Sequence, residues 1–431
     1  MEETGLKRLV VETTSLCNLS CKMCVKNTFA NGACSADGSM SEEMFLRMED
    51  SFASLESLVL NGVGEPLLNP SLVKFIARAA AKMPSHAQIG FQTNGTLFDA
   101  DITNNIIDAG ANTICLSVDS LNEEFLINAR GVGIATLEKA LVNLNNARDR
   151  SGRKNVRLGI EVVLMKDNFM ELPLIAQWAI NNGVSFILVS QLMPYSRLSA
   201  NDIAYDTNTQ SAIAIYKKWI QKAETEKLDF ERYYAAFMRF DVRSDEKNLR
   251  LLNLAKGMMA EADSEGVYLH VENLLKRDEE YLSRVKDVLT RTEALCNKHG
   301  VKLTVPEIAP RNTRRCEFVE ENTLFVSYDG QVSPCYFLWH RFNCYIGAVE
   351  NRVVPWLIGS LQESTIEEIW RGEAYQKFRK EVLKYSFPFC FDCSFALCDY
   401  VSEENFQQDC YLVEVPCATC LWCTGLFHCL Y

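Results

Sequence analysis

The sequence predicts an α/β protein with an open, partial (β/α)6 barrel, a helical insert and a small cysteine-rich C-terminal domain. Three observations support this class. Short apolar runs alternate with helical patterns from residue 7 to about 195, as in repeated β/α units around a parallel sheet. Charged and apolar residues are then interleaved at helical period to about residue 300. Finally, eight cysteines fall within the forty residues that begin at Cys390.

Six candidate strands occupy the first part of the chain. They are separated by helical patterns such as 71–82 and 135–148, in which apolar residues recur every three or four positions. Connections of that length suit parallel strands. Six units are too few for a closed eight-stranded barrel, so we expect an open one with its ligand site at the carboxyl ends of the strands. The expected strands are 7–12, 57–60, 87–91, 113–118, 157–165 and 185–191.

Changes in composition divide the chain into three expected domains. Residues 1–200 form the partial barrel, 201–300 a helical insert or bridge, and 301–431 the cysteine-rich domain. The insert begins near Asp206 and includes helical patterns over 249–261 and 271–298. It carries no catalytic signature, so we favour a solvated structural bridge over an element that grips substrate or docks a partner. Metal-held strands and turns in the last domain would need little apolar core.

The overall composition argues against several classes of protein. Hydrophobic residues make up 48% of the chain and charged residues 23%, and no run of eighteen apolar residues could span a membrane. A net charge of −12 argues against nonspecific nucleic-acid binding, and five scattered histidines argue against a zinc hydrolase. The first residues, Met-Glu-Glu-Thr-Gly, lack the pattern of a secretory signal. We therefore expect seventeen reduced, cytoplasmic cysteines that bind metal or clusters.

Three cysteines follow the first expected strand at short spacing. Cys17, Cys21 and Cys24 are separated by three and two residues, in a loop able to wrap around one metal centre. Thiolates are the usual ligands of iron–sulfur clusters, and three of them leave one iron open to another ligand. Such an open position is what metal catalysis requires. A zinc loop completed by a distant ligand such as Cys34 explains the spacing equally well.

Polar segments follow the next three expected strands. Each one, taken alone, is more simply explained by a loop, a turn or a helix cap. These segments contain Gly64, Glu65, Pro66, Thr93, Asn94, Ser117 and Asp119, at the ends of successive expected strands.

In this order the motifs resemble those of the radical S-adenosylmethionine superfamily, which places its three cysteines just after the first strand. The resemblance implies a catalytic [4Fe–4S] cluster on the three thiols. It also implies that segment 64–66 contacts the methionyl amino group, Gly64 by close approach and Glu65 as an acceptor, and that the later polar segments line the cofactor's side of the barrel. Met23 stands at a position that is commonly aromatic in the family. The implied reaction is reductive cleavage of S-adenosylmethionine to a 5′-deoxyadenosyl radical, which abstracts hydrogen from a substrate.

The cysteine-rich region resembles the SPASM type of auxiliary iron–sulfur domain. A glycine precedes Cys335 by five residues in Gly-Gln-Val-Ser-Pro-Cys, and a helix-like segment at 366–370 follows before Cys390-Phe-Asp-Cys393. Four residues separate Cys393 from Cys398, where the family has five. The assignment of ligands to one or two auxiliary clusters therefore stays open, and Cys344 is interpreted as a structural thiol. The expected ligands are Cys316, Cys335, Cys390, Cys393, Cys398 and Cys410.

The tail adds four cysteines beyond the usual set, at Cys417, Cys420, Cys423 and Cys429. We expect an auxiliary iron–sulfur cluster here, with zinc or a rubredoxin-type iron as the alternative. The whole C-terminal pattern is similar to that of maturases associated with tungsten-cofactor oxidoreductases.

These resemblances imply a radical enzyme that matures a metalloenzyme or its cofactor. The expected partners are a protein, peptide or metallocofactor substrate and a reduced ferredoxin- or flavodoxin-type electron donor, with no membrane or nucleic acid. A peptide-modifying or anaerobic sulfatase-type maturase is the alternative enzyme, because fold alone does not separate the two. An iron–sulfur electron carrier or a zinc-stabilised binding module is the alternative of another class. The strand-end motifs argue against it, since a carrier needs no nucleoside pocket. No catalytic acid or base stands out by spacing.

Overall fold

The computed structural model describes residues 5–28, 36–239, 245–346, 349–393 and 405–430, together with residues 398, 400 and 403. Its main feature is a ten-stranded sheet with the order β12-β9-β8-β1-β2-β3-β4-β5-β6-β7. From β8 to β7 in this order every neighbouring pair is parallel, whereas β9 and β12 pair antiparallel. Strands β12 and β7 are the two edges of the described sheet, so the barrel is open as predicted.

The six predicted strands are confirmed as the parallel centre of this sheet. Most of their residues are buried on both faces, which explains their nearly continuous apolar sequence. The third strand extends two residues past its expected end. The strands are β1 Arg8–Val11, β2 Ser57–Val59, β3 Gln88–Thr93, β4 Thr113–Ser117, β5 Arg157–Leu164 and β6 Phe186–Gln191.

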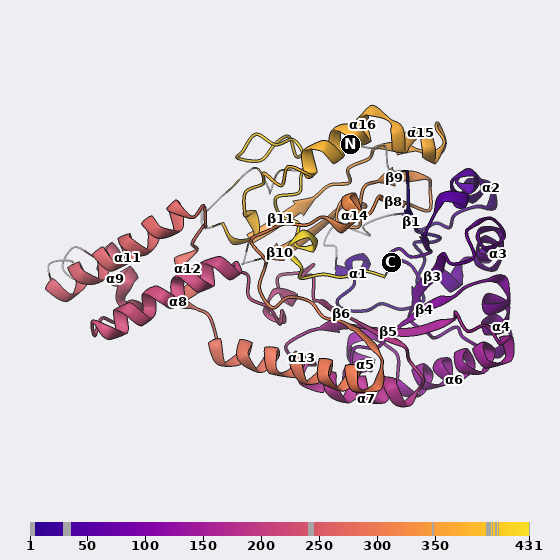
Figure 1. The fold of residues 1–431 in the computed structure, drawn as a ribbon, viewed down its shortest axis with the longest axis horizontal. Coiled ribbons are helices and arrows are strands. Elements are labelled where there is room, and N and C mark those ends of the chain that lie inside the picture. Colours follow the sequence, from indigo (N-terminus) through magenta and orange to yellow (C-terminus); the bar gives the residue numbers. More distant parts are fainter. Residues whose placement is uncertain are drawn as a thin grey trace.

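Helices lie along the outer side of these strands (Figure 1). In α3 (Leu72–Lys82) the buried residues recur at three and four positions, so one face of the helix joins the main core. The side chain of Asp99 begins α4 (Ala100–Ala109) by accepting a hydrogen bond from the backbone of Ile102. The helices that the sequence predicted at 71–82 and 135–148 are both confirmed, the first as α3 and the second as the helix Ile134–Ser151. The remaining members are α5 Glu123–Arg130, α6 Ile134–Ser151, α7 Leu172–Asn181 and α13 Glu279–His299.

Strands from the C-terminal part of the chain extend the same sheet on both sides. β8 (Thr323–Val326) pairs with β1 along its whole length, and β9 (Gln331–Ser333) and β12 (Gly359–Ser360) follow it. On the other side, β7 (Lys302–Thr304) pairs with β6. The strand that carries the first cysteine loop is therefore held between the barrel and the cysteine-rich region.

The helical insert forms a lobe that projects from the barrel (Figure 1). It has a hydrophobic core of its own, contributed by all four of its helices. The long helix α13, which falls in the same expected sequence range, instead buries Val285, Val288 and Cys296 in the main core. The helices of the lobe are α8 Gln210–Thr225, α9 Tyr233–Met238, α11 Glu246–Ser264 and α12 Val271–Leu275.

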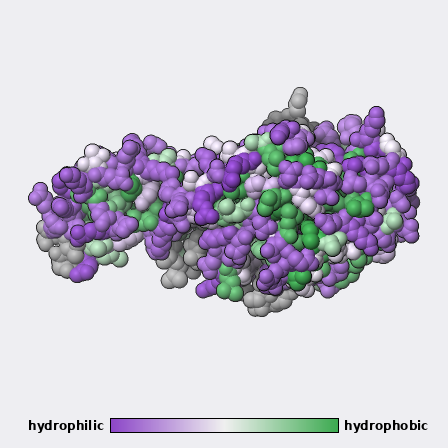
Figure 2. Space-filling model, turned by 90° about the horizontal axis from the view of Figure 1, so that it is seen from below, coloured by the Kyte–Doolittle hydropathy of each residue, from purple (hydrophilic) through white to green (hydrophobic). Residues whose placement is uncertain are grey.

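The remaining elements are short. Strands β10 (Phe342–Ile346) and β11 (Val349–Val353) form a separate antiparallel pair. Hydrophilic side chains cover most of the face shown in Figure 2. Among the described residues, no helix combines the length and the hydropathy that crossing a membrane requires. The other helices are α1 Val25–Thr28, α2 Glu42–Leu46, α14 Glu317–Glu320, α15 Ile366–Arg371 and α16 Glu373–Val382.

Candidate active site and cysteine sites

The loop after β1 brings Cys17, Cys21 and Cys24 to one cavity of 320 Å³. The backbone folds back on itself here, since the N–H of Cys24 donates to the carbonyl of Cys21 at 3.2 Å. Burial raises the pKa of the Cys21 and Cys24 thiols. A metal centre that binds these two thiols must therefore displace their protons. Cys34, the alternative zinc ligand, lies outside the described residues.

Glu65 organises the opposite side of this cavity, which we call the catalytic cavity. Its carboxylate is 2% exposed and accepts hydrogen bonds from the Thr93 hydroxyl at 2.7 Å and the Asn94 N–H at 2.8 Å. Burial raises the pKa of Glu65, and these hydrogen bonds oppose the rise. The Asn94 side chain in turn donates to Asn18, between the first two cysteines. The cysteine loop and the end of β3 are thus tied together.

Gly64 is required by the chain's own backbone. A Cβ at this position would lie 2.3 Å from the carbonyl oxygen of Thr14 and 2.5 Å from that of Leu16. The close approach that the sequence suggested at Gly64 therefore occurs between the loop after β2 and the segment after β1, and it does not depend on a ligand. Pro66 begins the short 3-10 helix that follows, and it is buried and does not line the cavity.

Asp119 lies behind the cavity wall, whereas Ser117 lines it. The Asp119 carboxylate is fully buried and accepts a hydrogen bond from Arg130 Nε at 2.5 Å and one from the N–H of Val163 at 2.9 Å. Arg130 itself lines the cavity, near the cysteine loop, since Cys21 Sγ contacts its carbonyl oxygen at 3.8 Å. In this structure Asp119 therefore positions a cation at the cavity instead of lining it.

Arg130 and Glu161 are cavity residues that the sequence reasoning missed. Burial raises the pKa of Glu161 to about 7, although the Arg130 charge opposes this effect. The Gln92 amide donates to the Glu161 carboxylate and accepts from Asn61 at 2.7 Å, so a polar chain crosses the ends of β5, β3 and β2. Glu161 could have been noticed in the sequence, because it is a single carboxylate inside the otherwise apolar run of β5. Arg130 could not, because it stands at the end of an ordinary exposed helix pattern.

The C-terminal domain closes the catalytic cavity with aromatic side chains. Tyr336, Trp339 and Trp422 line it together with Tyr195 from the segment after β6. Cys429 also lines it, and its sulfur accepts a hydrogen bond from Trp422 Nε1 at 3.2 Å. Cys429 was expected among the metal ligands of the tail, but the structure places it in this cavity, apart from the other tail cysteines.

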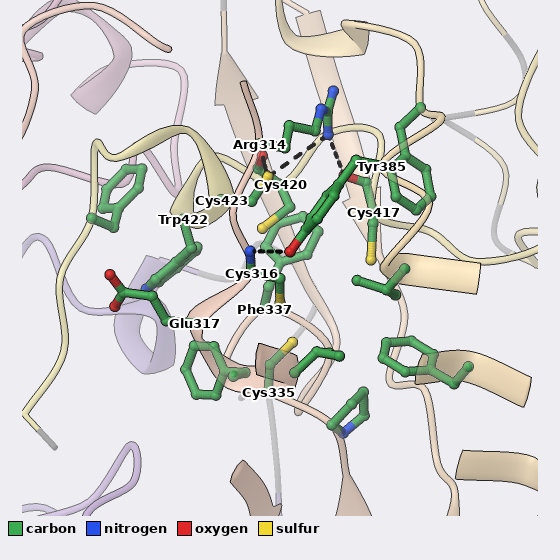
Figure 3. A pocket seen from close by; sticks show the side chains of 17 residues that line it. Arg314, Cys316, Glu317, Cys335, Phe337, Tyr385, Cys417, Cys420, Trp422 and Cys423 are labelled. Atoms are coloured by element: carbon green, nitrogen blue, oxygen red, sulfur yellow. Dashed lines mark hydrogen bonds between the residues drawn. The ribbon is translucent and has the colours of Figure 1, made fainter. Parts of the chain in front are cut away.

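Five cysteines from three segments surround a second cavity, which we call the five-cysteine site (Figure 3). Its other lining residues include Arg314, Phe337 and Trp422, and Trp422 thus lines both cavities. Burial raises the pKa of Cys335 to about 12. The interaction with the Cys420 thiol and the nearby Arg314 charge lower the pKa of Cys423. The five cysteines are Cys316, Cys335, Cys417, Cys420 and Cys423.

Four other cysteines form a second cysteine group. The pKa of Cys390 is raised, first by burial and then by the negative charges that three other cysteines carry when ionised, so these cysteines lie near it. Cys344 is buried in β10 as expected for a structural thiol, and Cys115 and Cys296 are buried in the main core. The members of the second cysteine group are Cys390, Cys393, Cys398 and Cys410.

No three His, Cys, Asp or Glu side chains among the described residues stand ready to hold a single metal ion. A [4Fe–4S] cluster makes a different demand, since each cysteine binds a different iron and the sulfurs need not converge on one point. The five-cysteine site and the second cysteine group both offer cysteine sulfurs as ligands, and cysteine thiolates are the usual ligands of such clusters.

Comparison with known proteins agrees with this chemistry. A model of the radical SAM superfamily matches residues 11–179, and a model of the SPASM iron–sulfur cluster-binding domain matches residues 316–394. The chain is 26% identical over 430 residues to the tungsten-containing aldehyde ferredoxin oxidoreductase cofactor-modifying protein of Pyrococcus furiosus, covering 98% of this chain and 97% of that relative. It is also 34% identical over 116 residues to a GTP 3′,8-cyclase of Klebsiella pneumoniae, covering 26% of this chain and 34% of the relative.

A solved structure shares the fold. Streptococcus suis SuiB bound to S-adenosylmethionine superposes with a TM-score of 0.51 at 12% identity, over 90% of this chain and 71% of that chain. The chain is therefore an S-adenosylmethionine-dependent iron–sulfur enzyme that contains a radical SAM domain at residues 11–179 and a SPASM domain at residues 316–394.

Proposed function

We propose that the protein is a maturase that uses radical chemistry to modify the cofactor of a tungsten enzyme or of a related metalloenzyme, or that enzyme itself. The observation that carries the proposal is the composition of the catalytic cavity, which combines the three thiols of the cysteine loop, a guanidinium and two carboxyl groups with an aromatic wall. Such a cavity suits a charged nucleoside cofactor with a substrate beside it. Similarity over almost the whole chain to a cofactor-modifying protein supports the choice of substrate class.

In this proposal Cys17, Cys21 and Cys24 hold a [4Fe–4S] cluster. Their three thiolates leave one iron for the methionyl group of S-adenosylmethionine. When bound, the cluster and this cosubstrate supply one-electron cleavage of the sulfonium and a 5′-deoxyadenosyl radical.

We assign Arg130 to the methionyl carboxylate and Glu65 to the methionyl ammonium group. Arg130 donates from Nε to Asp119, which leaves the terminal N–H groups of its guanidinium for a carboxylate. Glu65 is held in place by Thr93 and by the backbone of Asn94. Asn94 and Ser117 then supply polar groups for the ribose.

The aromatic wall protects the reacting atoms from water. The cavity is lined by Trp339, Trp422, Tyr195 and Tyr336, so a bound substrate would displace solvent from it. Glu161 is the titratable group in the cavity that we assign to proton transfer with substrate, because its pKa of about 7 lies near the working pH.

The five-cysteine site and the second cysteine group each hold one auxiliary cluster in this proposal. Three of the five cysteines belong to the tail, so the tail completes the first auxiliary site instead of forming a separate one. Cys429 is assigned to neither, because it lies in the catalytic cavity.

The cellular setting follows from the thiols. Free cysteines persist in a reducing compartment, so we place the protein in the cytoplasm and supply its electrons from a reduced ferredoxin- or flavodoxin-type donor.

Anaerobic reconstitution with iron and sulfide, followed by reduction and addition of S-adenosylmethionine, tests the radical chemistry. We expect 5′-deoxyadenosine from the native protein. The Cys21→Ala variant should form none of it and should lose iron from one cluster only. The matched control Cys296→Ala, which removes a thiol from the main core, should behave as the native protein does. Zinc bound at the three thiols would contradict the proposal.

The substrate class needs its own experiment. Adding the unmodified tungsten oxidoreductase, or its isolated cofactor, should increase the rate of 5′-deoxyadenosine formation. Stimulation by a precursor peptide or by a sulfatase-type peptide, with none by the oxidoreductase or its cofactor, would favour the peptide-modifying alternative.

A further inference from the structure

Arg314 is a buried cation at the centre of the C-terminal domain. The residue is 7% exposed, and its guanidinium donates hydrogen bonds to three carbonyl oxygens and one sulfur. The acceptors are Pro388 O at 2.7 Å, Cys417 O at 3.0 Å, Ala418 O at 3.3 Å and Cys423 Sγ at 3.8 Å. In Figure 3 the guanidinium lies above the tail cysteines, directed toward the five-cysteine site.

The charge of Arg314 lacks a carboxylate partner in the described part of the chain, where the residue makes no ion pair. The buried Asp409 is near enough to be affected by this charge but forms no ion pair with Arg314. Its Oδ1 accepts hydrogen bonds from the backbone N–H groups of Tyr411 and Val413, and its Oδ2 has no hydrogen-bond partner among the described residues. A buried cation without an anion in direct contact is costly, and carbonyl dipoles offset only part of that cost.

The anion that fits is metal-bound thiolate. Five thiols line the cavity beside Arg314, and one of them already accepts its hydrogen bond. Thiols become negatively charged when they bind a metal centre, so a cluster at this site would supply the charge that complements Arg314.

Arg314 also reaches toward the second cysteine group. Its guanidinium carbon lies 5.6 Å, 5.0 Å and 5.9 Å from the ring centroids of Phe387, Phe389 and Phe391, and the last two of these flank Cys390. The aromatic rings and the five-cysteine site together exclude water from the cation. In a low dielectric its charge acts strongly on any centre that gains an electron nearby.

We propose that Arg314 is the counter-ion of the centre held by the five-cysteine site and that it raises the reduction potential of that centre. A cation and an N–H donor at a ligand sulfur favour the more negative, reduced state, and hydrogen bonds to sulfur are a known determinant of cluster potential. This inference rests on the proposed assignment of an auxiliary cluster to these five cysteines. It makes Arg314 a positioning and tuning residue that is remote from the reacting substrate.

The test is a redox titration followed by electron paramagnetic resonance. The three cysteines of the first loop are replaced by alanine in every sample, so that only auxiliary centres contribute to the signal. Arg314→Gln keeps a donor but removes the charge, and it should lower the midpoint potential of one auxiliary centre. Arg314→Lys should keep the iron and show a potential closer to that of the parent. The matched control is Arg311→Gln, because Arg311 contacts the backbone of Thr424 in the same turn but no cysteine sulfur among the described residues.

An unchanged midpoint potential in Arg314→Gln, with full iron content, would overturn the proposal. If Arg314→Gln fails to retain the centre, the iron content and midpoint potential of Arg314→Lys decide between the two roles. Loss of the centre in both variants would show that Arg314 acts through its shape and hydrogen bonds instead of its charge. Formation of 5′-deoxyadenosine by the same Arg314 variants with the first loop intact separates this inference from the proposed function. Its absence in the native protein as well would refute the function and leave the potential shift standing.

Discussion

Glu161 lies inside β5, and its side chain reaches the catalytic cavity. Burial raises its pKa from 4.5 to about 7, so the folded protein holds this proton more tightly than the unfolded chain does. The stability that this proton contributes is complete below about pH 4.5 and is lost as the pH rises through 7. The Glu161→Gln variant keeps a neutral side chain throughout. We therefore expect its melting temperature, relative to that of the native protein, to rise between pH 5 and pH 8.

Thermal unfolding without cofactors measures this difference. Replacing the exposed Glu43 by Gln is the control, and it should leave the pH profile unchanged. Parallel profiles for native protein and Glu161→Gln would contradict the assignment of the buried proton to Glu161.

The Asp119–Arg130 pair provides a second test at the level of residues. Their side chains are 0% and 10% exposed, so Asp119→Asn leaves a buried guanidinium without its anion. Breaking such a pair costs about 3 to 5 kcal/mol. The exposed pair of Asp108 and Arg150 is the control, and Asp108→Asn should cost less than about 1 kcal/mol. Melting temperatures measure both changes, and equal values for the two variants would contradict the structural role of Asp119.

At the level of elements, the position of the cysteine loop depends on how closely two loops approach. Gly64→Ala would place a methyl group within 2.5 Å of two carbonyl oxygens of the segment that leads to Cys17. The loop must move, and displacements of this kind cost about a hundredfold in rate. We expect a loss of that size in 5′-deoxyadenosine formation and less iron at the first cluster, measured by electron paramagnetic resonance and iron analysis.

The control for this variant is Gly5→Ala, because no heavy atom lies within 4 Å of a Cβ there. Full activity in Gly64→Ala would mean that the loop tolerates the displacement, and that close backbone approach is not what requires a glycine at this position.

For the whole molecule, the helical lobe and the barrel have separate hydrophobic cores. The two ends of the lobe lie together, since Arg277 forms a buried ion pair with Asp206. Replacing residues 214–270 by a short Gly/Ser linker should therefore leave the barrel folded. We expect retained iron and unchanged 5′-deoxyadenosine formation without substrate. Loss of the first cluster in the shortened protein would show that the lobe supports the barrel.

Several parts of the site could be predicted from the sequence, because each of them depends only on residues that are close together in the chain. The six strands, the loop of Cys17, Cys21 and Cys24 and the polar strand ends are each encoded within a few residues. The position of Asp119 behind Arg130 could not be read, because it depends on contacts between separate β/α units. The same is true of Cys429, which shares spacing with the tail cysteines but lies in another cavity.

The sequence by itself determined the fold class, the family and the identity of the thiols, because periodicity and cysteine spacing are properties of adjacent residues. Only the tertiary structure decided how those thiols are grouped. It also decided that β8 would pair with β1 and that the buried Arg314 would lie beside the five-cysteine site. These outcomes depend on burial and charge between segments a hundred or more residues apart, where chain order carries no distance information.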